Sequence, residues 1–192
     1  MTMISVDIGG GESHEYSSGI TAGEVIQNVH GKKSGAVAAT VDGEERDMSH
    51  ILDSDCKVEP IIGDSEQGLY ILRHSCAHLL AQAVTELFPD AKPTIGPPIE
   101  HGFYYDFHMD PIGEGEMREI EKRMKELVKQ NLPMEREEHG NDSLREMFAS
   151  NPFKLEIMDD KIGGDVGSSA YRQGDFVDPV SYTHLRAHEP RH

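Results

Sequence analysis

The sequence predicts an α+β protein built from two domains. Its 192 residues, 36% of them hydrophobic and none of them Trp, are enough for two modest cores. Predicted strands and helices alternate irregularly and do not form regular β–α–β repeats. The pattern also changes at Gly63-Asp64-Ser65, a linker and helix-cap signal after which a long helix follows a strand-rich region. We therefore expect one domain over residues 1–62 and a second over residues 63–178.

The first domain has the pattern of a small fold with strands wrapped around one helix. Ile4, Val6 and Ile8 alternate with polar residues, as in a half-buried strand that ends at glycines 9–11. Thr21 followed by Glu24 is a capping-box signal, and the helix it opens is closed by Gly31. Further strands are expected at residues 14–17, 36–41, 44–48 and 56–62. This order indicates a β-grasp fold.

The second domain is organised around a predicted helix over residues 69–87. Apolar residues recur there at three-and-four spacing and form one stripe: Leu69, Leu72, Cys76, Leu79, Leu80, Ala83 and Leu87. His74 and His78 are four residues apart and share the opposite face with the small residues Ala77 and Ala81. Two imidazoles are therefore expected to line one wall of a site.

Three interpretations of this histidine pair are compatible with its spacing. The two side chains can be solvated or hydrogen-bonded on a polar face. They can chelate zinc, which requires one or two further ligands. They can also be neutral imidazoles that orient a substrate or relay a proton. Spacing alone does not choose among the three.

The remainder of the second domain mixes strands and helices. The region between Pro89 and Pro98 is expected to be a rigid loop. The elements predicted after it are an aromatic strand at 102–107, a helix at 114–132, a short helix ending near 149, a strand at 153–158 and a hairpin over 169–178 with its turn at Gly174-Asp175.

Composition excludes several classes of protein. The formal net charge of −17 argues against broad, sequence-independent binding to phosphate backbones. Cys56 and Cys76 are the only cysteines, which excludes a disulfide framework and a CxxC metal knuckle. The sequence contains neither an apolar run of membrane-spanning length nor a signal-peptide pattern. We expect a soluble, cytoplasmic protein without a membrane partner.

Four stretches together carry a resemblance to a known family. They are RHSCAHLLAQAV at 73–84, IGPPIEHGFYYDF at 95–107, NPFKLEI at 151–157 and YRQGDFVD at 171–178. In order and spacing the chain resembles the N-terminal region of bacterial-type threonyl-tRNA synthetases. The resemblance implies a TGS domain of β-grasp fold, followed by an α+β editing domain of the kind shared in outline with alanyl-tRNA synthetase.

The resemblance also implies a reaction and its residues. His74, His78, Lys154 and Asp178 match catalytic positions of an editing pocket that hydrolyses serine from mischarged tRNA(Thr), with Tyr104 and Asp106 as substrate-binding residues. In this scheme the histidines hold the water and the ribose hydroxyl. Lys154 anchors the RNA end or the oxyanion, and Asp178 orients the substrate's ammonium. Serine lacks one methyl group of threonine, a difference that binding alone discriminates only about 10- to 200-fold.

The sequence departs from the family after Asp178. The family continues with a Leu-Cys-Arg-Gly-Pro-His-like motif, whereas this chain has Val180 at the cysteine position and His184 at the histidine position. Residues 179–192 also become basic and His-rich, which we interpret as a non-matching, disordered or artefactual tail. We therefore expect impaired editing by an incomplete editing domain.

The resemblance sets expectations for cofactors and partners as well. The chain is interpreted as an N-terminal fragment without the ligase core, to which the family's ATP and zinc belong, so no cofactor and no metal are expected. Its partner is tRNA(Thr); the full-length family forms homodimers, and the fragment is expected to be a monomer. The alternative is a noncatalytic RNA- or partner-binding module.

Overall fold

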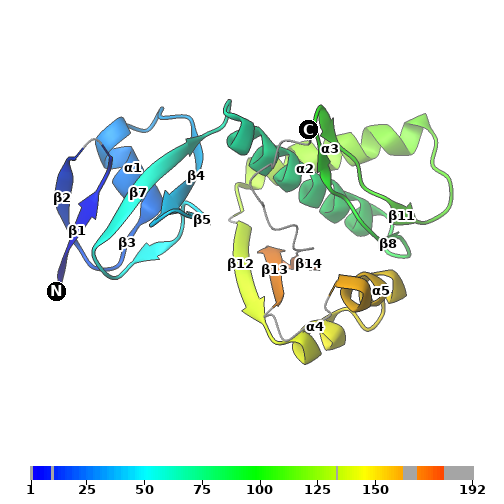
Figure 1. The fold of residues 1–192 in the computed structure, drawn as a ribbon. Coiled ribbons are helices and arrows are strands. Elements are labelled where there is room, and N and C mark those ends of the chain that lie inside the picture. Colours follow the sequence, from blue (N-terminus) through cyan, green and yellow to red (C-terminus); the bar gives the residue numbers. More distant parts are fainter. Residues whose placement is uncertain (1, 10, 133, 162–167, 180–192) are drawn as a thin grey trace, which may run out of the picture. The chain divides into compact units, whose positions relative to one another are not determined.

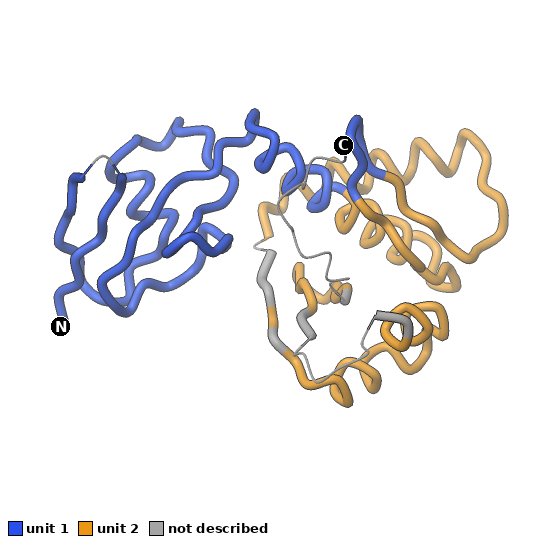
Figure 2. The backbone as a smooth tube through the Cα atoms, in the orientation of Figure 1, with its two compact units in different colours: residues 1–76, 98–103 blue, residues 77–97, 104–192 orange. Residues whose placement is uncertain are grey.

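A computed structural model describes residues 2–9, 11–132, 134–161 and 168–179, and the fold has mixed α+β architecture (Figure 1). This confirms the predicted α+β class. The chain divides into two compact units, the first comprising residues 1–76 and 98–103 and the second residues 77–97 and 104–192 (Figure 2). Among the described helices, none combines the length and the apolarity that crossing a membrane requires.

The first unit contains a five-stranded mixed sheet in the order β2-β1-β7-β4-β5. Its strands are β1 (Met3–Asp7), β2 (Ser13–Ser17), β4 (Ala36–Val41), β5 (Glu44–Arg46) and β7 (Cys56–Ile62). β1 pairs antiparallel with β2 and parallel with β7. Two short pairs complete the unit: β3 (Ile20–Thr21) with β6 (Ile51–Leu52), and β9 (Pro98–Ile99) with β10 (Gly102–Phe103).

Helix α1 (Ala22–His30) packs on this sheet. The predicted capping box is confirmed: Glu24 N donates to Thr21 Oγ1 at 3.2 Å, and Thr21 N donates to Glu24 Oε2 at 2.9 Å. Gly31 closes the helix at a φ of +79°, a conformation that favours glycine. The predicted apolar positions of the first strand and the helix form the core, which contains Ile4, Val6, Val25, Ile26 and Val58.

Helix α2 (Glu66–Leu87) is the predicted central helix, and it begins three residues earlier than expected. The predicted apolar stripe is wrong for its first turns, because Leu69 and Leu72 are 38% and 40% exposed. From Ala77 to Val84 every residue of the helix is buried or partly buried, so both sides of this part are covered. The predicted polar face of Ala77, His78 and Ala81 is buried, while Leu79 and Leu80 pack on an apolar core.

The second unit holds two small cores and a three-stranded antiparallel sheet in the order β12-β13-β14. Its elements are β8 (Lys92–Pro93), β11 (Phe107–His108), α3 (Glu114–Gln130), β12 (Met134–His139), α4 (Asn141–Met147), α5 (Pro152–Lys161), β13 (Ser168–Gln173) and β14 (Phe176–Pro179). α3, α4 and the β13–β14 hairpin lie where the sequence predicts them. One core joins α2 and α3, and the other joins α4, α5 and the hairpin.

Two predictions for residues 102–158 are wrong. Residues 153–158 form part of helix α5 and not a strand, because Pro152 occupies the first helical position, where its fixed φ favours a helix. The predicted continuous strand at 102–107 is divided between β10 and β11. The sequence pattern also misses β12, whose residues MEREEH lack apolar alternation.

Candidate active site

Four polar side chains of the second unit form one connected cluster: His78 of α2, Tyr105 of the segment before β11, Lys154 of α5 and Asp178 of β14. Asp178 Oδ2 lies 2.8 Å from both His78 Nδ1 and the Tyr105 hydroxyl. Lys154 Nζ lies 2.7 Å from Asp178 Oδ1 and donates to the Tyr105 hydroxyl at 2.8 Å. Residues from four separate elements are therefore hydrogen-bonded around one carboxylate.

The cluster is buried although it contains charged groups. His78, Lys154 and Asp178 are only 5%, 5% and 2% exposed. Burying a carboxylate or an ammonium costs several kcal/mol of solvation, which an ion pair offsets only when its hydrogen bonds are well formed. Hydrophobic side chains in the same space incur no such cost. A buried, compensated ionic cluster of this kind is therefore a candidate functional site.

The protonation states in the cluster follow from its contacts. Burial alone raises the pKa of Asp178, but the charge of Lys154 and the hydrogen bond from His78 outweigh it, so the net pKa lies well below its usual range. Burial, together with the nearby Asp178 charge, raises the pKa of the Tyr105 phenol well above its usual range. Asp178 is thus an anion and Tyr105 a neutral phenol at pH 7, and the Tyr105 hydroxyl donates to Asp178.

These states fix the orientation of the His78 ring. An ionised carboxylate only accepts hydrogen bonds, so His78 Nδ1 carries the proton that lies between it and Asp178. In the neutral ring Nε2 is then the basic nitrogen. The Tyr171 ring, 5.4 Å from the His78 ring between centroids, restricts it from another side. The arrangement suits a histidine that accepts a proton at Nε2.

Lys154 lies in the first turn of α5, where the helix dipole disfavours a cation. Asp178 and Tyr105 offset this by occupying two of the three hydrogen-bonding directions of the ammonium. The ammonium also lies 5.3 Å from the centroid of the Tyr105 ring. Among the residues that the structure describes, these two partners leave the third N–H direction of the ammonium for a ligand.

In the hydrogen bonds and ion pairs between described residues, the other predicted site residues do not take part in this cluster. His74 lies on the part of α2 that belongs to the first unit, with its ring nearly parallel to that of Tyr70 at a centroid distance of 6.5 Å. Tyr104 is 45% exposed, and Asp106 is exposed as well. The catalytic role of His74 and the substrate-binding roles of Tyr104 and Asp106 stay predictions. Val180 and His184 lie outside the described residues.

Tyr105 is the cluster member that sequence reasoning missed, although a signal for it exists. Phe103, Tyr105 and Phe107 alternate with Tyr104 and Asp106, as expected for the two faces of an extended segment. The rings of Tyr105 and Phe107 lie 4.9 Å apart between centroids. The apolar neighbours at i−2 and i+2 therefore mark Tyr105, and not Tyr104, as the inward residue.

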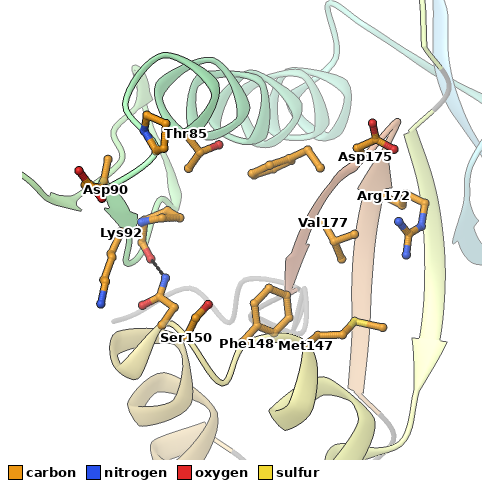
Figure 3. A pocket seen from close by; sticks show the side chains of 14 residues that line it. Thr85, Asp90, Lys92, Met147, Phe148, Ser150, Arg172, Asp175 and Val177 are labelled. Carbon is orange, nitrogen blue, oxygen red and sulfur yellow. Dashed lines mark hydrogen bonds between the residues drawn. The ribbon is translucent and has the colours of Figure 1, made fainter.

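A separate cavity of about 600 Å³ in the second unit is lined by residues of α2, β8, α4, β13 and β14 and of the loops between them. In Figure 3 its wall is formed by Thr85 of α2, by Met147 and Phe148 at the end of α4, and by Val177 of β14. Two further lining residues are hydrogen-bonded to each other, since Asn151 Nδ2 donates to Pro93 O at 2.8 Å. Within the described part of the chain, neither this cavity nor the cluster gathers three side chains of the types that ligate metals.

Comparison with curated proteins shows similarity to threonine–tRNA ligases. The chain is 51% identical to that of Thermoplasma volcanium over 132 residues, which are 69% of the chain and 20% of the relative. It is 39% and 38% identical to those of Streptococcus thermophilus and Thermotoga maritima over 186 residues each, 95% of the chain and 29% and 28% of the relatives. No family model matches the chain. The chain thus spans less than a third of the length of these relatives.

Proposed function

We propose that this chain, which belongs to the threonyl-tRNA synthetase family, hydrolyses the ester that joins a wrongly attached serine to tRNA(Thr). The observation that carries the proposal is the buried pair of His78 Nδ1 and Asp178 Oδ2, 2.8 Å apart and supported by Lys154 and Tyr105. Hydrolysis of an aminoacyl ester is accelerated by a base that takes a proton from water and by a hydrogen-bond donor, neutral or cationic, for the oxyanion. The cluster supplies one group of each kind.

In the proposed reaction His78 is the general base. Its Nε2 takes a proton from water while the water oxygen bonds to the ester carbonyl carbon. Asp178 keeps the proton on Nδ1 and stabilises the imidazolium that forms. The remaining N–H of Lys154 stabilises the negative carbonyl oxygen. When the carbon–oxygen bond to the ribose breaks, His78 returns its proton to the leaving ribose oxygen, which yields free serine and uncharged tRNA.

Such a reaction is useful because threonine and serine are difficult to distinguish by binding alone. Threonine differs from serine by one methyl group, and binding discriminates against the smaller substrate only about 10- to 200-fold. A second, hydrolytic site corrects the remaining errors. We assign substrate contacts to His74, Tyr104 and Asp106 on the family resemblance, and we propose that the hydrolysis needs neither ATP nor a metal ion.

We further assign the strand-rich part of the first unit to a TGS domain of β-grasp fold. Support comes from the β1–β2 hairpin, from α1 on the sheet and from β7 lying parallel to β1. The second unit then corresponds to an editing domain, with the domain limits expected near residue 62. The partner of both is tRNA(Thr).

The proposed activity is weak in the chain as written, because Val180 stands where the family has a thiol. Losing one well-placed transition-state contact typically costs about 10² to 10³ in rate. The test compares this chain with one that carries Leu-Cys-Arg-Gly-Pro-His and the rest of an editing domain after Asp178, using release of radiolabelled serine from seryl-tRNA(Thr). The extended chain is expected to be at least tenfold faster. Equal rates would contradict the assignment of the pocket.

A further inference from the structure

We propose that Gly96 is a positioning residue for the cluster: its missing side chain leaves the space in which the Tyr105 ring lies, and this places the Tyr105 hydroxyl between Lys154 and Asp178. Gly96 touches none of the reacting groups and acts through Tyr105. The inference about placement rests on geometry alone, and only its effect on rate rests on the proposed function.

The space around Gly96 is the first part of the argument. A Cβ atom at this position would lie 2.1 Å from Cδ2, 2.6 Å from Cγ and 2.7 Å from Cε2 of Tyr105. These distances are far below van der Waals contact, so a side chain at residue 96 and the present Tyr105 ring exclude each other. Gly96 does not have a positive φ. Glycine is therefore required here by the ring and not by the backbone conformation.

The backbone around the contact limits how the ring can yield. Asp106 N donates to Ile95 O at 2.8 Å, and Thr94 N donates to Asp106 O at 2.9 Å. These bonds hold the two extended segments together directly beside the Gly96–Tyr105 contact, in continuation of the β8–β11 pair. An aromatic ring that covers a glycine on the neighbouring strand is a known device for fixing the register of the two strands. A clash at residue 96 is thus expected to move the ring and not the strands.

Movement of the Tyr105 ring breaks the two hydrogen bonds that its hydroxyl makes within the cluster. The Tyr105 hydroxyl donates to Asp178 Oδ2 and accepts from Lys154 Nζ, both at 2.8 Å. A displacement of about 1 Å takes both distances out of the hydrogen-bonding range. Asp178 then keeps His78 and Lys154 but loses the phenol, and Lys154 loses one of its two partners. Gly96 therefore determines the geometry of a site to which it contributes no atom.

The test follows the phenol of Tyr105 by NMR on protein labelled with ¹³Cζ-tyrosine, with Tyr105→Phe identifying its signal among six tyrosines. In the unaltered chain this signal is expected to show no ionisation up to about pH 11. In Gly96→Ala the displaced phenol is expected to ionise near the ordinary value of about 10. Gly102→Ala is the matched control, since a Cβ there has nothing within 4 Å and its titration should not change. An unchanged Tyr105 titration in folded Gly96→Ala overturns the proposal, whether or not the chain hydrolyses any ester.

A second measurement covers a Gly96→Ala variant that fails to fold. In the Tyr105→Ala background the ring is absent, so adding Gly96→Ala is expected to leave Tm within about 1 °C, whereas in the unaltered background it lowers Tm by about 4 °C or more. Equal losses in both backgrounds overturn the proposal.

If the chain also hydrolyses seryl-tRNA(Thr), Gly96→Ala should lower kcat about tenfold. In the Tyr105→Phe background, where the hydroxyl is already absent, Gly96→Ala should not lower kcat further. Inactivity of every variant then counts against the proposed function alone.

Discussion

His78 Nδ1 and Asp178 Oδ2 lie 2.8 Å apart although 100 positions separate the two residues in the sequence. Both side chains are buried, and neither belongs to an apolar core cluster. Since a buried charge is tolerated only with partners, the contact links the position of β14 to the orientation of a histidine on α2. The predictions below test this link through stability, ionisation and activity.

Asp178→Asn should lower the free energy of unfolding by about 3–5 kcal/mol, because Lys154 is then buried without its counterion. The double variant Asp178→Asn/Lys154→Met should recover most of this loss, since it removes the uncompensated charge. Urea denaturation measures both. Glu114→Gln is the matched control, because it breaks an exposed pair with Arg118 and should cost at most about 1 kcal/mol. Recovery by less than half in the double variant would argue against an electrostatic cause.

Tyr105→Phe keeps the ring in its contact with Gly96 and its stacking on Phe107, and removes only the hydroxyl. We expect serine release to slow about tenfold, because Lys154 and Asp178 each lose a hydrogen bond. Tyr16→Phe is the control, since Tyr16 lies on β2 in the first unit and belongs to no proposed site. Equal effects of the two substitutions on kcat would refute the assignment of Tyr105 to the site.

Acid should destabilise the protein through two carboxylates. Hydrogen bonds from Arg172 and then His139 lower the pKa of Glu137 to about 2, and the pKa of Asp178 is also lowered. A lowered folded-state pKa means that the unfolded state binds more protons, so the stabilisation is complete above about pH 4.3 and is lost as the pH falls toward 2. Urea midpoints at pH 7, 5, 4 and 3 should therefore decline below pH 5. Glu137→Gln should decline less steeply; a decline as steep as that of the unaltered chain would exclude Glu137 as a source.

Purified protein should contain no stoichiometric zinc. His78 Nδ1 is bonded to Asp178, and Cys76 precedes the buried part of α2. A zinc site needs three or four side-chain ligands, and the described residues offer no such group. Elemental analysis checks this expectation. One tightly bound metal ion per chain that disappears in His74→Ala would restore the metallohydrolase interpretation of the histidine pair.

The parts of the fold that sequence reasoning obtained correctly carry strong local signals. The capping box of Thr21 and Glu24 and the glycine turn at Gly174, with φ +60°, specify their elements within a few residues. Residues 153–158 read FKLEIM, in which apolar and polar residues alternate as in a strand. In helix α5 the buried side chains of this stretch are Lys154 and Met158, which are four positions apart and therefore share one helix face. Short apolar runs do not distinguish these two cases.

In the candidate site, too, some residues could be predicted from the sequence and others could not. His78, Lys154 and Asp178 were predicted through family motifs, and the structure brings these three together. Which of the neighbouring residues Tyr104, Tyr105 and Asp106 points inward depends on the pairing of two extended segments. That pairing is a tertiary property, so the motif alone led to the outward residues.

The central claim is that His78, oriented by Asp178, removes serine from tRNA(Thr), and single-turnover release of radiolabelled serine tests it most directly. The extended chain described above, in excess over seryl-tRNA(Thr), should release serine well above the uncatalysed rate and spare threonyl-tRNA(Thr). His78→Ala and Asp178→Asn should each slow release about 10² to 10⁴-fold with unchanged circular dichroism. Release by the His78→Ala chain at the unaltered rate would contradict the account.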